Sequence, residues 1–226
     1  MTVSLTKRMT AEALGAGFLV ATVVGSGIMA DRLADGNTAL TLLGNTLPTG
    51  AILVVLILAL APVSGAHFNP AVSLVESTMG GLPWRDLAPY VMAQVVGGCL
   101  GTLTAHGMFD LALVQTSATV RTGAAQWLAE FVATFGLLMT ILAVVRFRIE
   151  AIPYAVGLYI TAAYWFTSST SFANPAVTIA RALTATFAGI APADVPAFIL
   201  AQCLGGLVAM VLMSWLLGLR PGKRSA

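Results

Sequence analysis

The tripeptide Asn-Pro-Ala occurs twice in this chain, at residues 69–71 and 174–176, each time inside a strongly apolar stretch. Asn followed by Pro suits the start of a helix, because the Asn oxygen caps free backbone N–H groups and Pro presets the first helical φ. The segments that follow, about 70–79 and 175–183, would be helices only ~15 Å long. Two of them end to end would cover the ~30 Å core of a bilayer. The repeat therefore predicts two half-helices whose capped ends meet inside a membrane.

The composition supports a membrane location. Hydrophobic residues make up 58% of the chain and charged residues 9%, and the mean hydropathy is +0.91, which lies outside the range of soluble domains. Segments long enough to span a bilayer, the fifth of them only marginally, lie at about 9–30, 40–63, 87–108, 125–145, 152–167 and 194–217. We therefore expect one integral membrane domain over residues 1–226.

The two halves of the chain repeat each other. Ala-Glu opens the first expected span at Glu12 and the fourth at Glu130, and Ala-Gln-x-x-Gly-Gly occurs at Gln94 and again at Gln202. The repeats lie at about 9–108 and 125–217. Because each half has three spans, the two copies insert in opposite orientations. Non-helical backbone before each Asn, at 64–68 and 167–173, then lies at the midplane, where it is tolerated only along a water-filled path or buried in protein.

The positions of the basic residues predict the orientation. In a six-span arrangement most of them fall on the side of the termini, whereas Arg32 and Arg121 fall on the other. The first group comprises Lys7, Arg8, Arg85, Arg146, Arg148, Arg220, Lys223 and Arg224. By the positive-inside rule both termini are cytoplasmic. The net charge of +2 thus reflects topology, and we expect no nucleic-acid partner.

The motifs together resemble those of the aquaporin and aquaglyceroporin channels, the major intrinsic protein family. The resemblance rests on Ser-Gly-Ala-His-Phe-Asn-Pro-Ala-Val at 64–72, on the second Asn-Pro-Ala, and on the two span-opening glutamates. It implies an all-α membrane protein with six transmembrane helices and two re-entrant half-helices in an inverted repeat. It also implies one pore per subunit, a homotetramer in a lipid bilayer, and small neutral solutes and water as partners. No cofactor or metal is implied, and a bacterial inner membrane is the expected location.

The expected pore midpoint is where the two Asn-Pro-Ala motifs meet. Asn69 and Asn174 would offer N–H donors to the oxygen of a permeating solute, and the positive amino ends of both half-helices would oppose a cation. The remaining midpoint residues are Pro70, Ala71, Pro175 and Ala176. We therefore expect passage of neutral molecules and exclusion of ions.

Three ionisable residues near the midpoint are expected to hold the loops. By resemblance, Glu12 and Glu130 face inward and accept hydrogen bonds from the re-entrant segments without touching the solute; a proton relay is the alternative. His67 precedes the first cap by two residues and is expected to form a loop-holding hydrogen bond, with a pH gate as the alternative.

The expected outer constriction departs from the family pattern. Most family members carry an Arg directly after the second Asn-Pro-Ala, whereas this chain has Val177. The other constriction positions, transferred by spacing, are Thr49, Ser171 and Tyr164, with Ala162 as the alternative to Tyr164. Such an uncharged ring would suit glycerol, urea-like molecules or metalloid acids such as arsenous acid. It is similar to the arsenic-associated branch of bacterial aquaglyceroporins.

Two charged residues flank the expected pore. Arg181 follows Val177 by four residues, one turn along the same helix face, and Glu76 occupies the matching place in the first copy. We expect Arg181 in the outer vestibule and Glu76 in the inner one. The alternative is that both snorkel or pair with loops.

Other functions remain open from the sequence. A mainly water-selective channel, an ion-coupled secondary transporter and a non-conducting structural or sensor protein share some of these features. Coupled transport usually needs a membrane-embedded charge at the substrate site, and none lies beside either Asn-Pro-Ala. An enzyme is not expected, because His67 and His106 are the only histidines and no nucleophile–base pair or metal-ligand cluster can be assembled.

Overall fold

The computed structural model describes residues 3–219, and the regular secondary structure in this part of the chain is all helix, which confirms the expected fold class. Its elements in chain order are α1 (Leu5–Leu33), α2 (Thr38–Ser64), α3 (Pro70–Thr78), α4 (Trp84–Met108), α5 (Ala124–Phe147), η1 (Ile149–Ala151), α6 (Ile152–Phe166), α7 (Pro175–Arg181), η2 (Pro192–Asp194) and α8 (Val195–Leu217). The basic residues Arg220, Lys223 and Arg224 lie outside the described residues.

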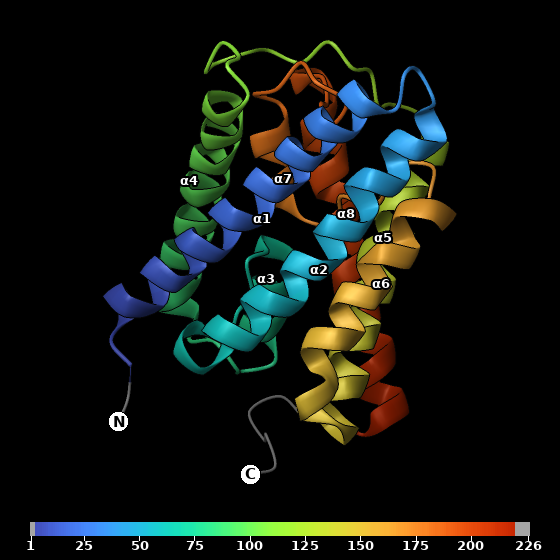
Figure 1. Cartoon of the computed structure of the whole chain (residues 1–226). Coiled ribbons are helices and arrows are strands. Elements are labelled where there is room, and N and C mark those ends of the chain that lie inside the picture. The colour runs from blue at the N-terminus through green and yellow to red at the C-terminus, as the bar shows by residue number, and fades with distance from the viewer. Residues whose placement is uncertain (1–2, 220–226) are drawn as a thin grey trace.

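Within the described residues, five helices are long and apolar enough to cross a membrane: α1, α2, α4, α5, and α8 together with η2. The sixth, α6, has only 15 residues, in agreement with the marginal length of the fifth expected span. The short helices α3 and α7 lie between the long ones (Figure 1).

The long helices pair in the same way in both halves. Helix α1 packs against α4 and α2, and α5 packs against α8 and α6. Glycines permit the close crossings: a Cβ at Gly97 would lie 2.1 Å from the carbonyl oxygen of Ala13, and one at Gly205 would lie 2.3 Å from that of Phe131. These backbones approach too closely for any side chain, as in small-residue interfaces between membrane helices.

Both half-helices begin at the predicted cap and end earlier than expected. The Asn69 side-chain oxygen accepts a hydrogen bond from the Ala71 N–H at 2.9 Å, and that of Asn174 accepts from the Ala176 N–H at 3.0 Å. Helix α7 ends at Arg181, whose carbonyl accepts from the Ile190 N–H at 3.3 Å. A contact from a later loop thus satisfies a carbonyl at the end of this helix.

Candidate functional site

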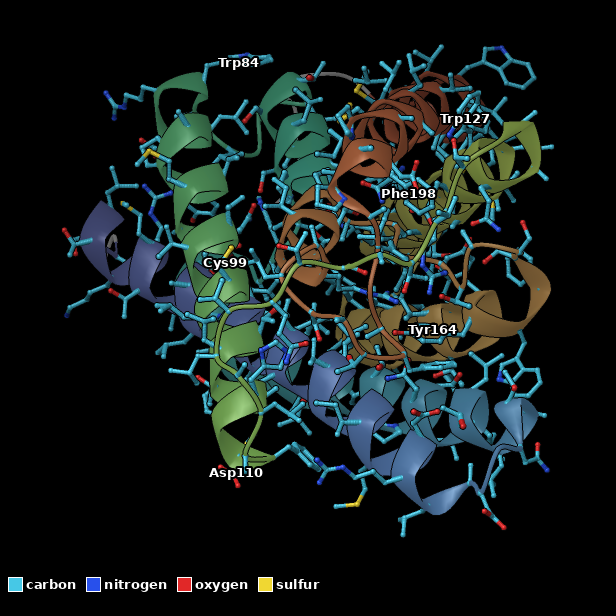
Figure 2. All side chains as sticks on the ribbon, turned by 90° about the horizontal axis from the view of Figure 1, so that it is seen from above. Trp84, Cys99, Asp110, Trp127, Tyr164 and Phe198 are labelled. Atoms are coloured by element: carbon cyan, nitrogen blue, oxygen red, sulfur yellow. The ribbon has the colours of Figure 1, made fainter. Side chains whose placement is uncertain are left out.

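A cavity of ≈ 620 Å³ is lined by residues from both halves of the chain. Most of the predicted pore residues line it. They are Thr49, His67, Asn69, Glu76, Tyr164, Ser171, Asn174, Val177 and Arg181. The other predicted residues, Glu12, Glu130, Pro70, Ala71, Pro175 and Ala176, lie behind this wall and are all buried. In the view from above (Figure 2), Tyr164 lies among the helices and Trp84 lies at the edge of the molecule.

At the middle of the cavity, each Asn links its own half-helix to the opposite half of the chain. The Asn69 Nδ2 donates to the Ala173 carbonyl at 2.7 Å, and the Asn174 Nδ2 donates to the Phe68 carbonyl at 2.8 Å. An amide nitrogen carries two donors, so one N–H of each Asn remains for the cavity. The sequence analysis predicted the caps and the free donors but missed this reciprocal cross-link.

Behind the cavity wall, the two glutamates hold the segments that precede the half-helices. Glu12 accepts from the backbone N–H groups of His67 and Phe68 at 3.0 and 2.7 Å. It also accepts from the Ser64 hydroxyl at 2.6 Å and from the Gln94 amide at 2.7 Å. The Glu12 carboxylate therefore serves four donors from three separate elements.

Glu130 occupies the matching position in the second half with fewer donors. It accepts from the Phe172 and Ala173 N–H groups, both at 2.9 Å, and from the Gln202 amide at 2.6 Å. No hydroxyl among the described residues donates to Glu130 as Ser64 does to Glu12. The repeat is thus conserved in geometry, and the first carboxylate has one more donor.

The segments held by the glutamates contain strained backbone. Ala66 and Phe68 in the first half, and Ser171 and Ala173 in the second, have φ between 48° and 52° although none is glycine. Such conformations cost on the order of 1–3 kcal/mol each and persist only when the surroundings impose them. The hydrogen bonds to Glu12 and Glu130 provide that constraint.

We therefore expect Glu12→Ala to destabilise the protein more than Glu130→Ala does. Each substitution leaves hydrogen-bond donors unpaired at membrane depth, which costs on the order of 1–3 kcal/mol per donor. Glu12 accepts from four donors, whereas Glu130 accepts from three. Thermal unfolding of the purified protein measures the difference. The exposed Glu150→Ala serves as the control for removing a carboxylate. Wild-type stability in both variants would show that the carboxylates do not hold the loops.

His67 lies between the cavity and a polar cluster. Its Nδ1 is 3.0 Å from the Ser73 hydroxyl, which also accepts from the Gln94 amide at 2.9 Å. Its ring centroid lies 5.5 Å from that of Tyr90. These contacts tie the His67 loop to α3 and α4, as a loop-holding role requires.

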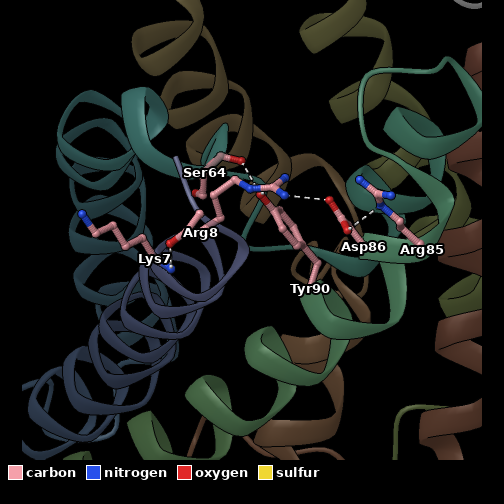
Figure 3. A network of polar contacts seen from close by, with 7 residues as sticks. Lys7, Arg8, Ser64, Arg85, Asp86 and Tyr90 are labelled. Carbon is pink, nitrogen blue, oxygen red and sulfur yellow. Dashed lines mark hydrogen bonds and ion pairs between the residues drawn. The ribbon is translucent and has the colours of Figure 1, made fainter. Parts of the chain in front are cut away.

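A second polar network, which the sequence analysis missed, lies near the start of α1 (Figure 3). Arg8 forms an ion pair with Asp86 at 2.7 Å, and the Tyr90 hydroxyl donates to the Ser64 carbonyl at 2.9 Å. Arg8 had been assigned to membrane topology alone. The pairing depends on α1 and α4 meeting at this end, which no local pattern reveals.

The four predicted constriction residues all line the cavity, and of the two candidates at the fifth span Tyr164 lines it whereas Ala162 does not. The Tyr164 hydroxyl donates to the Thr49 hydroxyl at 3.3 Å, whereas Ala162 is exposed on the outer surface of α6. Val177 is 5% exposed and lines the same cavity. Ser171 also lines it, and its hydroxyl has no hydrogen-bond partner in the described part of the chain.

The two charged residues expected in the vestibules are both buried in the cavity wall. Glu76 is 6% and Arg181 only 1% exposed. The Arg181 Nε donates to the Ala188 carbonyl, and its guanidinium carbon lies 3.3 Å from the centroid of the Phe172 ring. Arg181 is therefore held more rigidly than a side chain in an open vestibule would be.

Comparison with known proteins places this geometry in a wider context. The sequence profile described as Major intrinsic protein matches residues 1–149. The aquaglyceroporin AqpS of Rhizobium meliloti (strain 1021) is 62% identical over 213 residues, covering 94% of this chain and 91% of that protein. A probable aquaporin NIP-type of Nicotiana alata is 33% identical over 189 residues, covering 80% and 68%.

One solved structure has the same arrangement of helices. It is that of the aquaglyceroporin from Plasmodium falciparum, which matches with a TM-score of 0.74 over 95% of this chain and 97% of that one. The two sequences are 24% identical, so this likeness concerns the fold alone.

Proposed function

The chain belongs to the major intrinsic protein family, whose members are membrane channels and not enzymes, and from this premise we propose that its pore passes small neutral hydroxylated solutes together with water. Glycerol and arsenous acid are the solutes that we propose. The observation that carries this is Val177, which puts an apolar side chain in the cavity wall that Thr49 and Tyr164 also line. A wall of hydroxyls and apolar surface fits a solute that has both.

The arrangement at the midpoint supports passage of neutral molecules. The remaining N–H donors of Asn69 and Asn174 can bind a solute oxygen in turn. Around them the wall is largely apolar, so an ion would lose its hydration shell without replacement. The relative from Rhizobium meliloti is named an aquaglyceroporin, which agrees with a solute larger than water.

We also propose the arrangement of the protein in its membrane. Helix α1 begins and α8 ends toward the lower side of Figure 1, and the 109–123 segment runs over the upper side. With the basic residues Arg8, Arg85 and Arg146 on the lower side, the positive-inside rule makes that side cytoplasmic. We propose that the protein forms a homotetramer in a bacterial inner membrane. Each subunit would be one channel domain made of two inverted halves.

Solute flux into proteoliposomes tests the function. We expect glycerol and arsenous acid to enter vesicles containing the protein faster than protein-free vesicles, without saturation and without dependence on an ion gradient. Stopped-flow light scattering follows water and glycerol, and metalloid uptake is measured by elemental analysis. Water flux alone would indicate a water-selective channel. Saturable flux that follows an ion gradient would indicate a transporter, and no flux from well-folded protein would indicate a structural or sensor role.

A further inference from the structure

Two cationic side chains converge on Phe172 on the side of the molecule opposite the start of α1. The guanidinium carbon of Arg181 lies 3.3 Å from the centroid of the Phe172 ring, and that of Arg121 lies 5.0 Å from it. Arg181 ends α7, whereas Arg121 comes from the 109–123 segment, which crosses over the middle of the molecule in Figure 2. Two positive charges from distant parts of the sequence are thus brought to one aromatic ring that is itself 4% exposed.

No acidic side chain among residues 3–219 forms an ion pair with either arginine; the arginines that pair with a carboxylate there are Arg8 and Arg85, both with Asp86. Asp194 accepts from the backbone N–H of Arg121 at 2.7 Å and not from its guanidinium. The Arg121 side chain instead donates to the carbonyls of Gly189 and Ser169, at 2.8 and 3.3 Å. Carbonyl dipoles and the Phe172 ring, with no carboxylate, therefore hold the Arg121 guanidinium, whose pKa is lowered by burial.

Glu130 is a second buried carboxylate near the two arginines, and it is already occupied. Glu130 accepts from two backbone N–H groups and from Gln202, so its charge is used in holding the loop before α7. Burying a charge is costly unless an opposite charge accompanies it. The surroundings of Arg121 and Arg181 consequently favour an added negative charge.

Arg181 has N–H donors that are available to bind such a negative charge. Its Nε is bound to the Ala188 carbonyl, but neither terminal nitrogen has a hydrogen-bond partner in the part of the chain that the structure describes. The residue is 1% exposed and lines the cavity. A guanidinium presents its N–H groups in a planar fork that matches two oxygens of one oxyanion.

We propose that Arg181, with Arg121 as a second positive charge, forms a binding site for a small inorganic oxyanion at this end of the cavity. The site goes beyond the proposed passage of neutral solutes, because the anion is held and does not cross. The largely apolar cavity wall opposes its passage. A bound oxyanion would therefore obstruct neutral solutes that enter from the Arg181 side.

Sulfate is a suitable probe because its charge is constant near neutral pH. We expect the purified wild-type protein to bind sulfate in isothermal calorimetry, and sulfate present on both sides of proteoliposomes to slow glycerol entry relative to chloride at equal ionic strength and osmolarity. Arg181→Met should weaken sulfate binding by at least about tenfold, since hydrogen bonds between charged groups account for that much affinity. Arg181→Lys, which keeps the charge and loses the fork, should weaken it less.

Arg32→Met is the matched control. It removes one positive charge from the same side of the molecule, at an exposed side chain, and should leave sulfate affinity unchanged. No sulfate binding by the wild type, or equal affinity in wild type and Arg181→Met, overturns the proposal. If Arg181→Met does not insert into the membrane, the sulfate affinity of Arg121→Met is measured instead. An affinity equal to that of the wild type overturns the two-arginine site. Protein that binds sulfate but conducts no glycerol would refute the channel proposal while supporting this site.

Discussion

Glycerol permeability should fall on the order of tenfold or more in Val177→Arg, with a smaller loss of water permeability, because a pore discriminates by the room that its side chains leave. Val177 lines the cavity that also contains Thr49 and Tyr164. The new side chain would be long and always charged. It would also lie one turn from Arg181, and the repulsion between the two would favour its extension into the cavity. The ratio of glycerol to water permeability, measured in one vesicle preparation, reports the effect.

Two control variants separate position from charge. Val72 follows Asn69 by three residues, as Val177 follows Asn174, and it lines the same cavity in the other half. Val72→Arg adds the same side chain there and should change the ratio less if the narrowest point lies at Val177. Val177→Met adds length without charge and should lower the ratio by an intermediate amount. A ratio that stays equal or rises in Val177→Arg means that Val177 does not line the constriction.

Replacing either midpoint Asn by Leu should reduce the flux of neutral solutes by about tenfold or more. Each substitution removes a cavity-facing donor and also the cross-link to the opposite half, from Asn69 to Ala173 or from Asn174 to Phe68. A solute oxygen at the midpoint loses a hydrogen bond worth on the order of 1 kcal/mol or more where water is excluded, and about 1.4 kcal/mol in the barrier is tenfold in rate. Stopped-flow measurements at equal protein content in the membrane test this.

The loss of a helix cap is controlled separately. Asn37 caps α2, where its side chain accepts from the Leu40 N–H at 3.1 Å, and it does not line the cavity. Asn37→Leu therefore removes an Asn cap without touching the proposed pore and should conduct normally. Unchanged flux in Asn69→Leu and Asn174→Leu, with equal insertion, would contradict a pore based on two Asn donors.

The sequence by itself determined the features that depend on neighbouring residues or on composition. An Asn-Pro pair contains both a cap and a fixed φ, so the starts of α3 and α7 follow from local chemistry. Long apolar segments predict membrane helices because the bilayer imposes their length. The repeated Ala-Glu and Ala-Gln motifs predict two similar halves, because matching buried positions in the two halves carry the same residue types.

Only the tertiary structure decided which side chains from distant segments meet. The choice of Tyr164 over Ala162 depends on the rotation of α6 against α2, which a two-residue difference in loop length alters. The last carbonyl of α7 accepts a hydrogen bond from Ile190, in a loop that follows the helix. The meeting of Arg121 and Arg181 at Phe172 requires the 109–123 segment to fold over the molecule. Hydropathy and capping act over a few residues, whereas these contacts arise from the packing of whole helices, and packing is decided by all the side chains of an interface together.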